Sequence, residues 1–331
     1  MAPFKRFQLR SRANFIKYIG IELQLLKKEW KILLPCVLMQ YVHGIFHNLA
    51  YWVQGAKLSE IQRFPLYDLG FELMSELSES SAHASEYLVF GAVFAPAIAL
   101  VLTIPLFRQN PQRPRYMVII LKRVLFHISV ALIFRICSFM LTTLPGPARH
   151  CRLVVDAACK AANPNDIFKC VSENPDFIPP HGSKLFTNLD ALNGCGDLMF
   201  SSHTIYTLSL ILTIVKYWTN KYLITLLLCV QIAIAFLIVA SRKHYSLDVF
   251  TALYVVPLLW LTHEAYYKDI NHKDVTISAK TIHDFYGVDV SKDVGGGEFH
   301  QAVPLESVQV ASAEDNTEGT AVTAFQRKSS M

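Results

Sequence analysis

Hydrophobic and polar positions alternate along the 331-residue chain on the scale of whole segments. Six apolar runs are each long enough to cross about 30 Å of hydrocarbon as a helix, and polar or charged segments separate them. The runs cover roughly residues 32–53, 87–107, 124–144, 197–218, 222–240 and 246–265. Helices of soluble cores are rarely this long and this apolar. The pattern therefore predicts an all-α, polytopic membrane protein with six transmembrane helices.

Composition agrees with a membrane protein. The chain is 52% hydrophobic and 17% charged, whereas a soluble domain is about 25% charged. We therefore expect a membrane-embedded protein that has no nucleic-acid partner and that could form a homo-oligomer.

Lysine and arginine residues are distributed unevenly among the polar segments. The first 31 residues contain eight, whereas the first loop contains two, Lys57 and Arg63, among six acidic residues. The second loop again contains five: Arg108, Arg113, Arg115, Lys122 and Arg123. Because Lys and Arg favour cytosolic segments, we predict that both termini are cytosolic and that the first, third and fifth loops are lumenal.

Three regions are predicted along the chain. Residues 1–31 form a basic cytosolic segment, in which 13–30 make an interfacial helix beside anionic headgroups. Residues 32–265 form the six-span catalytic domain, with a lumenal loop at 145–196. Residues 266–331 are polar and read as a largely disordered cytosolic tail. No cleavable signal peptide is predicted, so the first span would act as the membrane anchor.

Four of the seven cysteines lie in the predicted lumenal loop: Cys151, Cys159, Cys170 and Cys195. An oxidising lumen favours one or two disulfides among them, and the sequence leaves all three pairings open. Zinc binding is the weaker interpretation, since no tight Cys-x-x-Cys pair is present.

Two polar clusters interrupt the apolar pattern, "CGDLMFSSHT" at 195–204 and "SRKHYSLD" at 241–248. Two membrane crossings separate His203 from His244, so both histidines are expected on the lumenal side. Asp248 is four residues beyond His244 and can orient its imidazole, leaving the other nitrogen free to attack. The fourth and sixth spans would both start here, capped by Asp197 and Ser246, and their N-termini would favour a phosphate. This combination indicates phosphoryl transfer.

Other polar residues within the spans have plainer interpretations. His43, His47 and His127 are interpreted as headgroup contacts. Arg135 lies midway along the third span, where an unpaired charge is costly. It is either a functional residue or one partner of an ion pair within the bundle, with Asp197 or Asp248 as the acid.

The two histidine clusters together resemble the paired motifs of the sphingolipid synthase family, part of the wider lipid phosphate phosphatase superfamily. "FPLYDLGFELM" and "RICSFMLTTLPGPARHC" are similar to further motifs of that family. "KKEWKILLPCVLMQYVHGI", "GCGDLMFSSHT" and "ASRKHYSLDV" resemble the plant-type inositol phosphorylceramide synthases. The resemblance covers roughly residues 20–265.

This resemblance implies a lipid phosphate phosphatase-like helical core in the (trans-)Golgi membrane and a lumenal triad of His203, His244 and Asp248. The implied substrates are phosphatidylinositol and ceramide, with a phosphohistidine intermediate and neither cofactor nor metal. Substrate-binding candidates are Arg135, Asp197, Ser201, Ser202, Arg242 and Lys243. Ser202 replaces the glycine of the animal Ser-Gly-His pattern, and Arg242 is closer to the histidine than in the phosphatases.

Several alternatives stay open at this point. A choline headgroup would require an aromatic or acidic cage, whereas inositol requires hydrogen-bond partners. Sphingomyelin synthase, ceramide phosphoethanolamine synthase and lipid phosphate phosphatase activities are the alternative chemistries. A non-catalytic lipid transporter or scaffold, whose helices would be broken near the midplane, is the alternative class.

Overall fold

The computed structural model describes residues 9–107, 115–188, 194–218 and 220–266. The predicted disordered tail lies outside the described residues, as do the first eight residues and the basic segment at 108–114.

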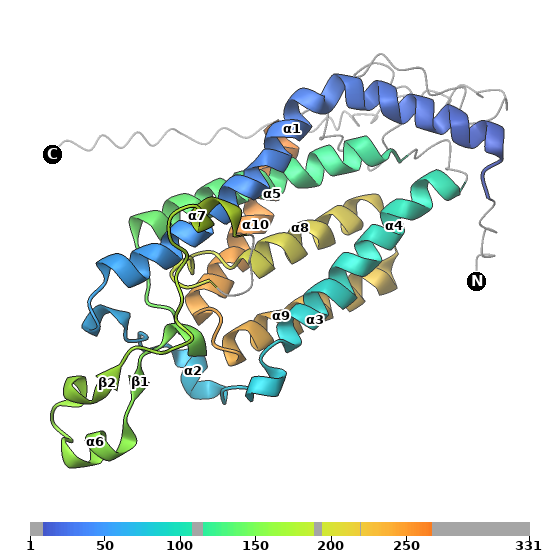
Figure 1. Cartoon of the computed structure of the whole chain (residues 1–331). Helices are drawn as coiled ribbons and strands as arrows, with labels where there is room; N and C mark the ends of the chain where they lie inside the picture. Colours follow the sequence, from blue (N-terminus) through green and yellow to red (C-terminus); the bar gives the residue numbers. More distant parts are fainter. Residues whose placement is uncertain (1–8, 108–114, 189–193, 219, 267–331) are drawn as a thin grey trace, which may run out of the picture. The chain divides into compact units, whose positions relative to one another are not determined.

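Six helical segments, at the positions of the six predicted spans, make up most of the described chain (Figure 1). The first, α1, is Arg12–Lys57. The second runs without interruption through α3 (Ala84–Leu88), a π-helical segment, η3 (Val89–Phe94), and α4 (Ala95–Leu106). The others are α5 (Met117–Leu141), α8 (Ser202–Tyr217), α9 (Lys221–Ala240) and α10 (Ser246–Tyr266).

Five of these spans are long and apolar enough to cross a membrane, judged by length and composition. The exception is α8, which has 16 residues and packs among α5, α9 and α10. The predicted all-α, polytopic fold is confirmed.

The first span differs from its prediction in one respect. The expected interfacial helix at 13–30 and the expected span at 32–53 form the single helix α1. Pro35 lies inside α1 and cannot donate a backbone hydrogen bond, and Figure 1 shows α1 changing direction along its length. A proline is a sufficient cause for such a bend.

Apolar side chains fill the space between the spans and also cover their outer faces. One core cluster joins Ile128 and Leu132 of α5 to Ile205 and Leu208 of α8 and to Val256 of α10. Large apolar side chains also face outwards, among them Leu226, Phe236 and Leu258. Helices that are apolar on all sides belong in lipid, where the outer faces meet acyl chains.

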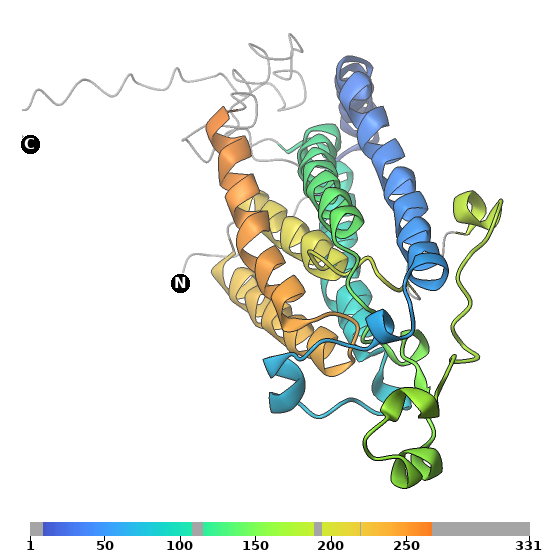
Figure 2. The same cartoon turned by 90° about the vertical axis from the view of Figure 1, so that its left-hand side faces the viewer.

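The first, third and fifth loops meet at one end of the bundle (Figures 1 and 2). Ser246 donates to Asp68 over 2.6 Å, and Arg149 donates to Glu76 over 2.8 Å. These bonds confirm that the three loops lie on the same side. Their short elements are η1 (Ile61–Arg63), α2 (Leu69–Leu73), η2 (Glu79–Ser81), η4 (Arg149–Cys151), α6 (Ala157–Ala162), η5 (Ile167–Cys170) and α7 (Lys184–Thr187), with β1 (Val154–Val155) antiparallel to β2 (Val171–Ser172).

Two disulfides stabilise the third loop. Cys159 pairs with Cys170 across the β1–β2 hairpin, and Cys151 pairs with Cys195, 44 residues later. The prediction of one or two disulfides is confirmed, and the structure selects the pairing.

Candidate active site

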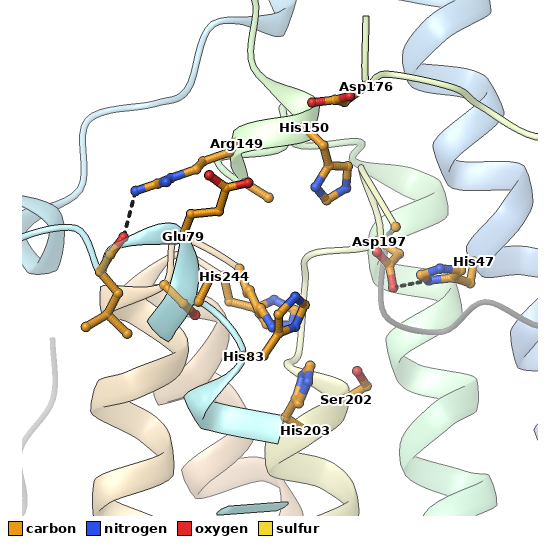
Figure 3. A pocket seen from close by; sticks show the side chains of 16 residues that line it. His47, Glu79, His83, Arg149, His150, Asp176, Asp197, Ser202, His203 and His244 are labelled. Atoms are coloured by element: carbon orange, nitrogen blue, oxygen red, sulfur yellow. Dashed lines mark hydrogen bonds and ion pairs between the residues drawn. The ribbon is translucent and has the colours of Figure 1, made fainter. Parts of the chain in front are cut away.

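A cavity of about 230 Å³ opens where the loops meet the helix ends. Pockets for drug-sized ligands occupy about 300–1,000 Å³, so this cavity has the size of a headgroup rather than of a whole lipid. Figure 3 shows the side chains that surround it. They come from α1, from the three loops and from α8: His47, Leu77, Glu79, Ala82, His83, Ala148, Arg149, His150, Asp176, Gly194, Asp197, Ser202, His203, Ser241, Lys243 and His244.

His203 and His244 both line this cavity, and their ring centroids are 6.0 Å apart. His203 lies in the first turn of α8, and His244 lies in the turn between α9 and α10. The two sequence motifs are therefore brought together as their shared membrane side predicted.

The hydrogen bonds of His244 determine which nitrogen is reactive. Its Nδ1 lies 3.1 Å from the carbonyl oxygen of Leu198 and 3.6 Å from Oδ2 of Asp248. A carbonyl oxygen and a carboxylate only accept hydrogen bonds, so Nδ1 carries the proton and the lone pair is on Nε2. Burial lowers the pKa of His244 more than the Asp248 charge raises it, which favours the neutral, nucleophilic imidazole.

Asp248 also stabilises the start of α10. Its carboxylate accepts a hydrogen bond of 3.0 Å from the backbone N–H of Tyr245, the residue before the helix. This is the reciprocal half of a capping box. Asp248 is 1% exposed, so one buried carboxylate fixes both the helix start and the histidine that precedes it.

Arg135 is the centre of a buried network behind the cavity. Its guanidinium lies 2.6 Å from Oδ2 of Asp197, which also accepts from His47 over 2.8 Å. The ion-pair interpretation of Arg135 is confirmed, with Asp197 as the acid. His47 and Arg135 hold the pKa of Asp197 below its usual range, against the effect of burial.

The same arginine explains where α8 begins. Arg135 donates to the backbone carbonyls of Asp197, Met199 and Phe200, and Phe200 has a positive φ of 59°. These bonds stabilise a non-helical turn, because buried carbonyls need hydrogen-bond donors. The predicted helix start at Asp197 is therefore wrong. Helix α8 starts at Ser202, so His203 lies closer to the helix end than the sequence indicated.

The capping predictions for Asp197 and Ser246 were also wrong. Asp197 pairs with Arg135 and His47, and Ser201, the N-cap of α8, makes no side-chain capping bond. Ser246 is the first residue of α10 and donates its hydroxyl to Asp68.

The remaining candidates divide between the cavity and its surroundings. Ser202 and Lys243 line the cavity. Ser201 is fully buried, and its hydroxyl has no hydrogen-bond partner among the described residues. Arg242 has a positive φ of 59° and turns away from the cavity, donating to the carbonyls of Phe71 and Met74. It therefore ties the fifth loop to the segment around α2.

Sequence reasoning missed Glu86, which lies behind the cavity wall. It is 5% exposed, its carboxylate contacts the Lys243 ammonium, and it lies 3.8 Å from Nε2 of His203. The sequence did contain a signal for it, because Glu86 is an acidic residue at the start of the second apolar run, and ionisable residues in membrane-spanning segments are functional candidates. His47 was missed as well: it was interpreted as a headgroup contact, whereas it lines the cavity and binds Asp197.

A metal site is a poor fit to the described residues. One group, His150, Cys151 and Cys195, places its ligand atoms within 4.8 Å of one another. Its two sulfur atoms form a disulfide, so they are not the thiolates that zinc requires.

The cavity therefore offers a nucleophilic imidazole, a second imidazole that can transfer a proton, and an ammonium group. Helices α8 and α10 also start here, and their N-termini favour an anion. Nucleophile, acid and anion site together are the components of phosphoryl transfer.

Comparison with known proteins agrees with this chemistry. The family described as PAP2 superfamily C-terminal matches residues 194–265, which include both cavity histidines of the α8–α10 region. The chain is 33% identical over 250 residues to phosphatidylinositol:ceramide inositolphosphotransferase 2 of Arabidopsis thaliana, covering 74% of this chain and 73% of the relative. It is 35% identical over 246 residues to phosphatidylinositol:ceramide inositolphosphotransferase of Oryza sativa subsp. indica, covering 73% of this chain and 67% of the relative.

A more distant relative is sphingomyelin synthase-related 1 of Caenorhabditis elegans. The two are 30% identical over 164 residues, which is 48% of this chain and 31% of the relative.

Proposed function

The chain belongs to the phosphatidylinositol:ceramide inositolphosphotransferase family of sphingolipid synthases, and on that premise we propose that it transfers phosphoinositol from phosphatidylinositol to the primary hydroxyl of ceramide, releasing diacylglycerol. The observation that carries the proposal is the pair of imidazoles 6.0 Å apart on one cavity, each with a buried carboxylate within 3.8 Å.

The lining of the cavity supports inositol as the headgroup. None of the 16 described lining residues is Phe, Tyr or Trp, so the lining offers no aromatic cage for a choline cation. Of the three carboxylates in the lining, that of Asp197 is already paired with Arg135. The lining instead offers carboxylates, imidazoles and two serine hydroxyls. These groups donate to and accept from hydroxyls, as a neutral polyol requires.

In the first step, Nε2 of His244 attacks the phosphorus of phosphatidylinositol. The phosphorus–oxygen bond to diacylglycerol breaks, and His203 gives its proton to the departing oxygen. The headgroup is then bound to His244 through phosphorus. Asp248 stabilises the positive charge that develops on the ring, since it lies 3.6 Å from Nδ1.

In the second step, neutral His203 removes the proton from the primary hydroxyl of ceramide. The ceramide oxygen attacks phosphorus, the phosphorus–nitrogen bond breaks, and the electron pair returns to Nε2 of His244. Lys243 and the N-termini of α8 and α10 stabilise the phosphate charge in both steps. Glu86 stabilises His203 when that imidazole is protonated.

The cavity is proposed to face the lumen of the Golgi, with both termini in the cytosol. Two disulfides in the loop that lines the cavity support this side, because disulfides persist in oxidising compartments. The basic N-terminal segment supports a cytosolic N-terminus.

The test is to incubate membranes containing the chain with labelled ceramide and one phospholipid at a time. Phosphatidylinositol should yield labelled inositol phosphorylceramide and diacylglycerol in equal amounts. Phosphatidylcholine and phosphatidylethanolamine should yield little product. A product with phosphocholine or phosphoethanolamine, or donor hydrolysis without transfer, would contradict the proposal.

A further inference from the structure

We propose that Glu79 and His150, here called the outer pair, form the subsite that recognises the hydroxyls of the donor's cyclic polyol headgroup. This inference rests on the proposed function and concerns the part of the cavity that takes no part in the chemistry. The outer pair comes from two loops, η2 and η4, and both residues line the cavity.

The cavity has two distinguishable ends. Figure 3 shows His203 and Ser202 on the side of the helices, His150 on the side of the loops, and His244 between them. Phosphorus must lie within bonding distance of His244, and the departing diacylglycerol oxygen must reach His203. The acyl chains belong on the helix side, since that is where lipid contacts the protein. The headgroup, attached to another phosphate oxygen, therefore extends towards the outer pair.

The outer pair suits the hydroxyls of a ring. A carboxylate accepts hydrogen bonds from two neighbouring hydroxyls, and an imidazole donates from one nitrogen and accepts at the other. The neighbouring basic side chain, Arg149, is directed elsewhere, because it donates to Glu76 over 2.8 Å and to the carbonyl of Leu77 over 2.7 Å. The charge at this end is therefore not arranged for a second phosphate.

His150 is held firmly enough to discriminate between headgroups. The next residue, Cys151, is fixed by its disulfide to Cys195, and the ring of Tyr51 lies edge-on to His150 at 6.4 Å. The disulfide also ties His150 to the turn that leads into α8. A fixed donor or acceptor loses less conformational entropy on binding than a mobile one.

The experiment uses the full chain in detergent micelles with a short-chain ceramide. Glu79→Ala and His150→Ala should each raise the KM for phosphatidylinositol about tenfold, as expected for losing one or two hydrogen bonds to a bound substrate. The KM for ceramide and the kcat should change less than about threefold. Glu72→Ala and His181→Ala remove an exposed carboxylate and an exposed imidazole that are outside the cavity, and they should leave all three constants unchanged.

Two soluble inhibitors locate the effect. Inhibition by inositol 1-phosphate should weaken in Glu79→Ala and His150→Ala by the same factor as the KM rises. Inhibition by inorganic phosphate, which needs only the catalytic end, should be unchanged, and this also shows that the variants are folded. Equal weakening of both inhibitors, or an unchanged KM for phosphatidylinositol, would overturn the subsite. Absence of phosphoinositol transfer by the unaltered chain would instead overturn the proposed function.

Discussion

The carboxylate of Glu86 lies 3.8 Å from Nε2 of His203, so His203 and His244, two of the five histidines that line the cavity, each have a buried acid beside them. Asp248 belongs to the same turn as His244, whereas Glu86 is 117 residues before His203 in the chain and is contributed by a different helix. In the proposed mechanism, Asp248 stabilises the positive charge that develops on His244, and Glu86 stabilises His203 while that imidazole carries its proton.

Glu86→Gln is expected to slow transfer about 10- to 100-fold, because general acid catalysis contributes about 10²–10⁴ and the glutamine cannot stabilise protonated His203. A donor carrying a nitrophenolate leaving group needs no acid, so on it the variant should approach the rate of the unaltered chain. Glu72→Gln, an exposed carboxylate on α2, is the matched control and should behave normally on both donors. An equal loss on both donors would contradict the link to His203.

The pH dependence of donor cleavage should follow His244. Protonation of Nε2 blocks attack, so the rate falls as the pH drops through the pKa of His244. Burial lowers that pKa below the ordinary value of about 6.5. Asp248→Asn removes a charge that raises the pKa, so the acid limb should move to still lower pH while the maximal rate falls. Asp176→Asn removes an exposed acid of the same cavity and should leave the fall in rate at low pH where it is in the unaltered chain. A shift of that fall to higher pH in Asp248→Asn would contradict the assignment.

How much of this site the sequence predicts depends on how local each relation is. His244 and Asp248 are four residues apart, and their pairing follows from helical spacing. The placement of His203 and His244 on the same side of the bundle follows from counting the membrane crossings between them. The sequence left two acids, Asp197 and Asp248, as possible partners of Arg135, because both lie at polar interruptions on the same side of the bundle. The structure shows that the partner is Asp197.

The errors come from contacts that no local pattern contains. Arg135, on α5, binds three carbonyls of the turn before α8 and keeps that turn non-helical. Rules based on helix propensity and capping therefore placed the helix start too early. Arg242 was assigned to substrate, yet two carbonyls near α2 bind it. Glu86 and His47 were missed because their partners are distant in sequence.

The two disulfides should differ in their effect on activity. Loss of Cys151–Cys195 frees a loop of 44 residues and releases the turn before His203, and chain-entropy arguments give about 4 kcal/mol of lost stability. Loss of Cys159–Cys170 frees a loop of 11 residues in a hairpin outside the cavity, and the same argument gives about 3 kcal/mol of lost stability. We therefore expect Cys151→Ser with Cys195→Ser to lower activity per folded molecule, and Cys159→Ser with Cys170→Ser to spare it.

Thiol counting checks the pairing directly. Alkylation of the unfolded, unreduced chain should modify Cys36, Cys137 and Cys229 alone, and reduction should expose all seven. Alkylation of all seven without reductant would exclude both bridges.

The orientation in the membrane is tested by protease protection. A tag on the C-terminal tail should be digested when protease is added outside sealed Golgi-type vesicles. A second tag after Gly182, in the exposed part of the third loop, should be protected until detergent is added. Protection of the tail in intact vesicles would reverse the topology and place the cavity on the cytosolic side.

The covalent intermediate separates catalysis from lipid binding. With donor labelled in its inositol and no ceramide present, the unaltered chain quenched in base should retain label on His244, since acid cleaves a phosphorus–nitrogen bond. His244→Ala should abolish the label, the transfer and any slow donor hydrolysis, because all three pass through the same imidazole. His203→Ala should lower the rate by about 10²–10⁴ through loss of the proton donor.

The control is His181→Ala, which removes an exposed imidazole of the third loop that does not line the cavity; its labelling and transfer should be normal. His203 and His244 lie at polar helix ends rather than among packed apolar side chains, so their alanine variants should insert and fold. Melting temperatures in detergent would verify this for each variant. If His244→Ala inserted correctly and still transferred phosphoinositol at a near-normal rate, the nucleophile would have to be another group. A binding role, as in a scaffold or transporter, would then explain His244 better than catalysis, because removing a headgroup contact weakens affinity without stopping the chemistry.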